Sequence, residues 1–233
     1  MGNYKPFELK MLSSTKAIIF YISVFVLNYL NSLLSMIGEY SSKPVDTNKF
    51  IFSHSFFFLT GIFSLVFIYV IKTNLDNGYF ERLKSYGFKN IQILRLLFER
   101  LFFFFIVIIG IVFLTVILLK LSGLSLIGLI SIKTSVVFLL GILFFSSFLG
   151  FLFFTTGNII ISIIVFFSYS ILEKILYKYI LHIEDQIFFP FQAIGFLRKN
   201  ESIPIAFFIY FLIFLCCFCF VVFKKTVWLK KSK

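Results

Sequence analysis

Charged residues, and acidic residues above all, are scarce in this sequence. Only 14% of the 233 residues are charged, with 10 Asp and Glu against 22 Lys and Arg, whereas soluble domains average about 25% charged residues. Hydrophobic residues make up 60% of the chain, which is more than one globular core of this length could bury. The composition therefore excludes an ordinary soluble domain.

Cysteine and histidine are rare as well, which argues against disulfide and metal chemistry. The 3 cysteines, Cys216, Cys217 and Cys219, lie together in the last apolar run with no His or acidic residue nearby. We interpret them as small buried side chains. His182, Glu184 and Asp185 have the side-chain types of metal ligands, but they do not form a recognised ligand motif, so we predict no metal site.

Catalytic and phosphate-binding motifs are absent from the sequence. It has no paired carboxylates within an apolar run, no HExxH pattern and no glycine-rich phosphate loop. We therefore predict that this chain carries no catalytic residue and binds no cofactor. No cleavable signal peptide is expected either, because the first apolar run begins near Ala17 and is long enough to span a membrane.

What the sequence does contain is a series of long apolar runs. A run of about 20 residues crosses a hydrocarbon core of roughly 30 Å as a helix, and these runs are continuous, not alternating as in a membrane β-barrel. The 4 prolines lie outside the runs or at the start of one, where a missing N–H costs least. The fold class we predict is an all-α polytopic membrane protein of six spanning helices: 17–37, 50–71, 101–119, 136–154, 159–173 and 204–223.

The segments between these spans have distinct compositions. Residues 1–16 mix apolar side chains with lysines, which predicts an amphipathic segment in the membrane interface. The connection 120–135 is either an external helix or the start of a long, tilted fourth span with Lys133 at the interface. Residues 72–100 form the most polar segment, and 174–203 form a long segment before the last span.

Positive charge is distributed unevenly among these segments. With both termini in the cytoplasm, 14 of the 22 Lys and Arg residues lie inside, as the positive-inside rule requires. We therefore predict cytoplasmic termini, and we interpret the net charge of +12 as cytoplasmic loop charge and not as a nucleic-acid surface. The excess of Phe, Ile, Lys and Asn is typical of proteins encoded by an AT-rich genome. We expect the protein to lie in the cytoplasmic membrane of a bacterium.

The polar segment 72–100 predicts two helices separated by a glycine. Tyr79, Leu83 and Tyr86 recur at helical spacing and form an apolar stripe, with Glu81, Arg82 and Lys84 off the stripe. Gly87 then ends the helix, because glycine readily adopts the left-handed conformation at a helix C-terminus. A second helix is expected from Lys89–Asn90 into the third span, with Gln92, Arg95, Glu99 and Arg100 on its polar side.

This segment and the six-span layout resemble the permease subunit of a type-2 ABC exporter. Glu81, Leu83, Gly87, Lys89 and Ile93 match the acidic, leucine, glycine, basic and hydrophobic positions of that family's loop after the second span. The resemblance implies that the short helix is a coupling helix that docks on a separate ATPase subunit. The implied coupling interface consists of Tyr79, Glu81, Arg82, Leu83, Lys84, Tyr86, Gly87, Phe88 and Lys89.

The resemblance also implies an assembly. Two permease subunits, identical or paralogous, would work with two ABC ATPase subunits that bind ATP and Mg²⁺, and segment 174–203 would re-enter the membrane as a helical hairpin. The transported substrate would be a peptide, a lipid-like compound or another amphipathic molecule. A non-transporting immunity or scaffold protein that binds a partner through residues 78–100 is the alternative. A secondary transporter is disfavoured, because no charged or broken-helix site appears near the membrane midplane.

A few polar residues within the spans are candidates for a pathway or for helix packing. Asn28 and Asn31 are expected on one face of the first span with Ser32 nearby. His54 is the clearest ionisable residue within a span, and we interpret it as an interfacial or packing residue. Ser146 and Gly150 have the small-xxx-small spacing of closely packed helices.

Overall fold

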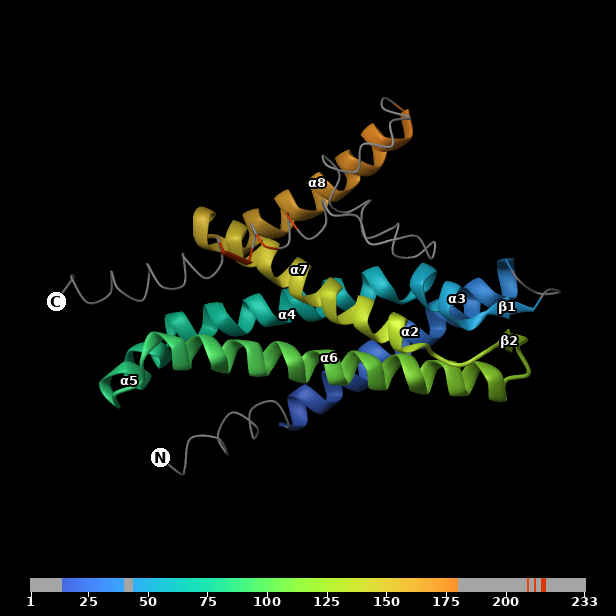
Figure 1. The fold of residues 1–233 in the computed structure, drawn as a ribbon, viewed down its shortest axis with the longest axis horizontal. Coiled ribbons are helices and arrows are strands. Elements are labelled where there is room, and N and C mark those ends of the chain that lie inside the picture. The colour runs from blue at the N-terminus through green and yellow to red at the C-terminus, as the bar shows by residue number, and fades with distance from the viewer. Residues whose placement is uncertain (1–13, 40–43, 180–208, 210–211, 213–214, 217–233) are drawn as a thin grey trace. The chain divides into compact units, whose positions relative to one another are not determined.

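The computed structural model describes residues 14–39, 44–179, 209, 212, 215 and 216. Within these ranges the chain is mostly helical, with two strands of two residues each (Figure 1). The predicted interfacial segment 1–16, the external segment 174–203 and the sixth span 204–223 lie wholly or largely outside the described residues. The elements are α2 (Thr15–Glu39), β1 (Val45–Asp46), α3 (Thr47–His54), α4 (Phe56–Asp76), α5 (Tyr79–Ser85), α6 (Asn90–Leu121), β2 (Leu126–Ile127), α7 (Ile132–Thr156) and α8 (Ile159–Tyr179).

Four of the described helices are long and apolar enough to cross a membrane: Thr15–Gly38, Phe56–Asp76, Ile91–Leu121 and Ile132–Thr156. The helix α8 adds a shorter apolar stretch, Ile159–Glu173. These helices indicate a membrane-embedded protein, and they cover the first five predicted spans. The number of six spans and the cytoplasmic location of both termini stay predictions.

Three boundaries differ from those expected. The predicted second span, 50–71, was wrong at its start, because the helix is interrupted at Ser55 and α3 is a separate short helix that begins at Thr47. The open question about 120–135 is also answered: residues 122–131 form turns and the strand β2, and α7 begins at Ile132. The predicted connection 155–158 shortens to Gly157–Asn158 because α7 continues to Thr156.

The chain divides into two compact units. Among the described residues, the first unit comprises those up to Leu59 together with Ile106–Ser131, and the second comprises Thr60–Phe105 and the residues from Ile132 onward. The helices α4 and α6 contribute to both units.

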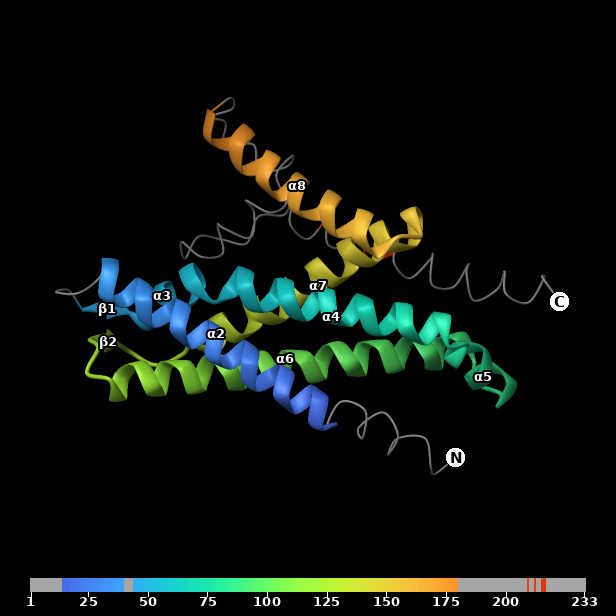
Figure 2. The ribbon, with the colours of Figure 1, turned by 180° about the vertical axis from the view of Figure 1, so that it is seen from behind.

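In the first unit, a small β-bridge joins segments far apart in the sequence. The strands β1 and β2 pair in parallel, with Val45 opposite Leu126 (Figure 2). Beneath them, Met36, Phe50, Leu119 and Leu126 form a buried apolar cluster. Asp46 caps α3 by accepting a hydrogen bond from the Lys49 N–H at 2.9 Å. The bridge therefore rests on a core contributed by α2, α3 and the C-terminal end of α6.

Thr47 fixes this bridge from the side of α3. Its hydroxyl donates to the Ile127 carbonyl at 2.8 Å and approaches the Gly128 carbonyl at 3.2 Å, and the residue is fully buried. We expect Thr47→Val to destabilise the fold by about 0.5–1.5 kcal/mol, because the bond from the buried Thr47 hydroxyl to the Ile127 carbonyl is lost. Hydrogen–deuterium exchange should show faster exchange at 122–131.

Thr155→Val is the matched control for this substitution. Thr155 is exposed, and its hydroxyl donates only to carbonyls of its own helix, Phe151 at 2.9 Å and Leu152 at 3.0 Å. The control should leave exchange at 122–131 unchanged. Equal exchange in wild type and Thr47→Val would contradict the assigned role of Thr47.

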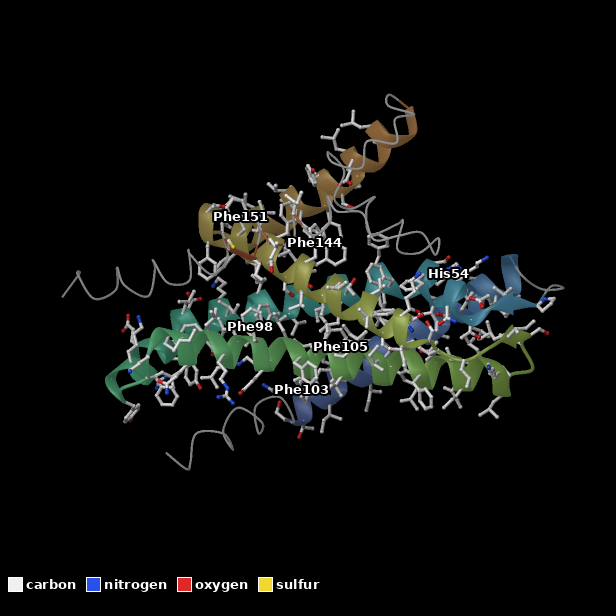
Figure 3. The ribbon with its side chains drawn as sticks, viewed as in Figure 1. His54, Phe98, Phe103, Phe105, Phe144 and Phe151 are labelled. Atoms are coloured by element: carbon white, nitrogen blue, oxygen red, sulfur yellow. The ribbon has the colours of Figure 1, made fainter. Side chains whose placement is uncertain are left out.

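In the second unit, aromatic side chains join α7 to α8. Phe166 of α8 contacts Phe145 and Phe148 of α7, with ring centroids 5.5 and 5.7 Å apart. Phe144, labelled with Phe151 on α7 in Figure 3, stacks on Phe148 at 6.4 Å. Aromatic pairs at such distances add about 0.5–1.5 kcal/mol beyond the area they bury. The many phenylalanines of the sequence thus serve here as core residues.

Candidate functional site

The polar segment after α4 forms a short helix, a glycine turn and a long helix, as predicted. The helix α5 covers Tyr79–Ser85, Gly87 adopts φ +85°, and α6 begins at Asn90. A second glycine, Gly78, adopts φ +62° at the N-terminus of α5. The helix α5 is thus bounded at each end by a glycine in the left-handed conformation.

The turn at Gly87 is a hydrogen-bonded Schellman motif. The Phe88 N–H donates to the Leu83 carbonyl at 3.1 Å, and the Gly87 N–H donates to the Lys84 carbonyl at 2.9 Å. These two bonds satisfy carbonyls that the end of a helix otherwise leaves unpaired. Gly87 therefore sets a defined angle between the two helices instead of a loose connection.

The start of α6 is capped from the other side of the turn. The Gln92 side chain accepts a hydrogen bond from the Lys89 N–H at 2.8 Å, while the Lys89 carbonyl accepts from the N–H groups of Gln92 and Ile93 at 3.0 and 3.2 Å. This is one half of a capping box, with Gln92 in the N3 position. Only Phe88 separates the two hydrogen-bonded ends, so α5 and α6 are closely coupled.

The buried face of α5 differs from the predicted stripe. Phe80 and Leu83 are 5% and 2% exposed, whereas Tyr86 is 65% exposed and Tyr79 is half-buried. Leu83 of the predicted stripe Tyr79–Leu83–Tyr86 therefore packs into the protein, and docking of a partner on this stripe stays a prediction. Sequence analysis missed Phe80, although its spacing of three residues from Leu83 also fits one helix face.

The exposed side of the segment is basic and partly apolar. Glu81, Arg82, Tyr86, Gly87 and Lys89 are exposed, and Lys84 and Phe88 are half-buried. Ile91, in the first turn of α6, is 63% exposed and was not predicted. We call the connection between α5 and α6 the α5–α6 joint, and we call its exposed residues Arg82, Tyr86, Lys89 and Ile91 the joint surface. Its two cations and two large side chains suit a partner with acidic groups beside an apolar surface.

Arg100 was expected on the polar side of the second helix, but it is buried. Its side chain is 3% exposed, and the guanidinium lies over the Tyr79 ring, 5.8 Å from the ring centroid. A cation over an aromatic face contributes about 0.5–2 kcal/mol, more when it is shielded from water. This contact fastens the start of α5 to α6 at a second point, one residue before the long apolar run.

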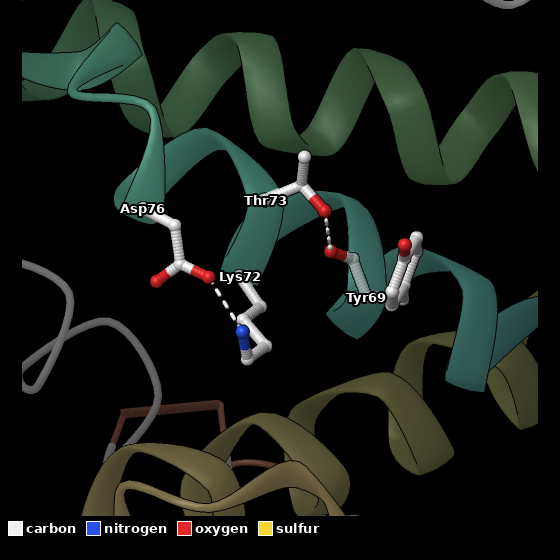
Figure 4. A network of polar contacts seen from close by, with 4 residues as sticks. All are labelled: Tyr69, Lys72, Thr73 and Asp76. Atoms are coloured by element: carbon white, nitrogen blue, oxygen red, sulfur yellow. Dashed lines mark hydrogen bonds and ion pairs between the residues drawn. The ribbon is translucent and has the colours of Figure 1, made fainter.

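The end of α4 that leads into the segment is held by local contacts. Lys72 and Asp76 form an ion pair one turn apart, and the Thr73 hydroxyl donates to the Tyr69 carbonyl at 3.0 Å (Figure 4). An exposed pair of this kind adds about 0.3–0.5 kcal/mol. Arg82 reaches back across the turn and donates to the Asn77 carbonyl at 3.2 Å.

Some of the other polar candidates are buried, and others are exposed. Asn28 is buried and donates to the Thr115 hydroxyl at 3.1 Å, and Ser32 is buried as well. Asn31 was placed on the same face, but it is exposed and donates to the His54 carbonyl at 3.2 Å. His54, labelled in Figure 3, is the last residue of α3 and lies 4.7 Å from the Phe50 ring between centroids. The assignment of these residues to a pathway or to helix packing stays a prediction.

Ser146 and Gly150, the two residues of the small-xxx-small pattern, lie on one helix. Both are buried in α7, and the Ser146 hydroxyl donates to the Ser64 hydroxyl of α4 at 3.0 Å. For Ser146 this bond is a contact between two helices, and close packing at Gly150 stays a prediction. Among the described residues, no group of three or more His, Cys, Asp or Glu side chains is arranged to hold a metal ion.

Comparison with known proteins adds no relative. No protein-family model matches the sequence, and neither a curated protein nor a solved structure is significantly similar to it.

Proposed function

We propose that this chain is the permease subunit of an ATP-driven exporter of the type-2 ABC class. The observation that carries the proposal is the α5–α6 joint, a short helix fixed by a Schellman turn and a capped start to a helix that continues through an apolar run. The sequence resemblance supports the same assignment. ATP and Mg²⁺ would be bound by a separate ATPase subunit in two copies, with a second permease subunit completing the assembly.

In this proposal the joint surface receives the force of ATP hydrolysis. Movement of the ATPase subunit displaces α5 through contacts with Arg82, Tyr86, Lys89 and Ile91. Because α5 is tied to α6 by the Gly87 turn and by the Arg100–Tyr79 contact, the displacement is passed to α6 as a rigid-body motion. Such motions open a transport path alternately to the two sides of a membrane. A peptide, a lipid-like compound or another amphipathic molecule is the substrate class we propose.

Charge reversal on the joint surface tests the proposal. Arg82 is exposed, so Arg82→Glu should leave the fold intact while reducing binding of the ATPase subunit by about tenfold, equivalent to about 1.4 kcal/mol. The measurement is the amount of ATPase subunit recovered with the permease in mild detergent. Because Arg82 also donates to the Asn77 carbonyl, the melting temperature is recorded in parallel.

Lys49→Glu is the matched control, because Lys49 is an exposed cation on α3, outside the joint. It should retain full recovery of the ATPase subunit. Equal recovery in both variants would contradict docking at the joint surface. Failure of wild-type protein to bind any ATPase subunit would instead favour the non-transporting scaffold or immunity protein.

A further inference from the structure

The loop between α6 and α7 exposes an unusual amount of apolar surface. Ile127 and Leu129 are 58% and 81% exposed, and Leu121, at the end of α6, is 78% exposed. Leu126, the neighbour of Ile127 in β2, is buried in the cluster with Met36, Phe50 and Leu119. The loop therefore has a filled core on one side and apolar side chains directed outward on the other.

The backbone of this loop is hydrogen-bonded to side chains of the same unit. Three consecutive carbonyls accept such bonds: Ile127 from Thr47 at 2.8 Å, Gly128 from the Lys120 ammonium at 2.7 Å, and Leu129 from Asn48 at 3.2 Å. The Ser131 N–H donates to the Asn48 side chain at 2.9 Å. Loops usually lie in water because their backbone N–H and C=O groups need hydrogen-bond partners. The four backbone groups named above already have such partners within the protein.

The start of the loop is closed in the same way. The Leu124 N–H donates to the Leu119 carbonyl at 3.3 Å and the Gly123 N–H to the Lys120 carbonyl at 3.1 Å, with Gly123 at φ +79°. This is a Schellman turn that satisfies the last carbonyls of α6. Non-helical backbone is tolerated next to hydrocarbon only when the protein pairs its polar groups, and the paired groups of this loop meet much of that requirement.

The exposed side chains of the loop continue an apolar face of α6. Phe113, Leu114, Ile117 and Leu118 are between 36% and 54% exposed on the preceding turns of this helix, within a stretch long and apolar enough to span a membrane. In a spanning helix these residues face lipid. Leu121, Ile127 and Leu129 extend the same kind of surface past the end of the helix.

We propose that residues 121–129 form a membrane-seated loop whose exposed side chains, Leu121, Ile127 and Leu129, insert among lipid acyl chains at the bilayer interface. The occupant of this surface is lipid and not a protein partner, because the surface continues the lipid-facing side of α6. The Lys120 ammonium donates to the Gly128 carbonyl. In this proposal the bond gives the charged group a partner at the edge of the hydrocarbon layer. The proposal needs only that the helices span a membrane, so it stands or falls separately from the exporter assignment.

Tryptophan fluorescence in lipid nanodiscs tests the loop directly. The chain has 1 Trp, at position 228, so Trp228→Phe gives a background without tryptophan. In that background Leu129→Trp should emit at short wavelength, and brominated phosphatidylcholine should quench it several-fold more than aqueous iodide does. Leu129 is 81% exposed, so the larger ring is expected to fit without disturbing the core.

Tyr86→Trp in the same background is the reference for a water-exposed site, because Tyr86 is 65% exposed on a polar segment. It should be quenched by iodide and little by bromolipid. Quenching of Leu129→Trp by iodide to the level of this reference would overturn the proposal. Shielding of Leu129→Trp from both quenchers, with disulfide cross-linking of Leu129→Cys between copies, would assign the surface to a second copy and overturn it as well.

Discussion

Leu83→Asp is expected to unfold the α5–α6 joint. Leu83 is 2% exposed, and with Phe80, which is 5% exposed, it forms the buried face of α5. Truncating a buried leucine to alanine costs about 2–5 kcal/mol, and aspartate adds the cost of removing a carboxylate from water. The combined loss of folding free energy is comparable to the total stability of many domains, about 5–15 kcal/mol.

The readout for Leu83→Asp is the fraction of protein that stays monodisperse in detergent after a heat pulse. Tyr86→Asp is the matched control, since it introduces the same side chain three residues later at a position that is 65% exposed. The control should melt close to wild type. If the two variants melt at the same temperature, Leu83 is not buried, and it belongs to the docking surface that the sequence suggested.

Gly87→Pro is expected to separate ATP hydrolysis from transport. Proline fixes φ near −65° and has no N–H, whereas Gly87 adopts φ +85° and donates to the Lys84 carbonyl at 2.9 Å. The Schellman turn cannot form, because both the positive φ and the N–H of its glycine are lost. On the proposed function, substrate-stimulated ATPase activity and transport should fall by at least about tenfold, which corresponds to only 1.4 kcal/mol.

Two further variants distinguish a coupling defect from general instability. Gly87→Ala places a Cβ into open space, so its only cost is that of the left-handed conformation, about 1–2 kcal/mol. Its stimulated ATPase activity and transport should lie between those of wild type and Gly87→Pro. Gly123→Pro breaks the equivalent turn after α6, where the Gly123 N–H donates to the Lys120 carbonyl, and should preserve ATPase binding and stimulation. Full coupled transport by Gly87→Pro would refute the mechanism.

Local sequence was sufficient to predict the elements around the joint. A glycine after an amphipathic turn predicts a helix end, and long apolar runs predict spanning helices. The structure agrees at Gly87 and at Asn90. Each of these features is determined by residues within one or two turns, so no knowledge of distant segments was needed.

The buried face of α5 could not be predicted in this way. Tyr79, Phe80, Leu83 and Tyr86 offer two overlapping apolar stripes, one that contains both tyrosines and one that contains Phe80. Tertiary contacts decide between them, including the contact of Arg100 with Tyr79. Tyrosine fits either side, because its ring is apolar and its hydroxyl tolerates water.

The β-bridge and the interruption at Ser55 were missed for a different reason. Thr47 and Asn48 bond to residues 80–83 positions away in the sequence, and no local pattern announces such a pairing. Ser55 interrupts the helix without proline or glycine, so the apolar run 50–71 appeared continuous. Hydropathy records which residues avoid water, but it does not record where the backbone changes direction.

If the third span begins after Arg100, as the sequence predicts, and not at Ile91, the length of α6 sets a distance between the membrane and the joint. The stretch Asn90–Arg100 precedes the long apolar run and adds about 16 Å to the helix at a rise of 1.5 Å per residue. The headgroup layer on one side of a bilayer accounts for only about 5–8 Å. If α6 crosses upright, α5 stands clear of the lipid phosphates, and a protein docked there can rotate without displacing lipid.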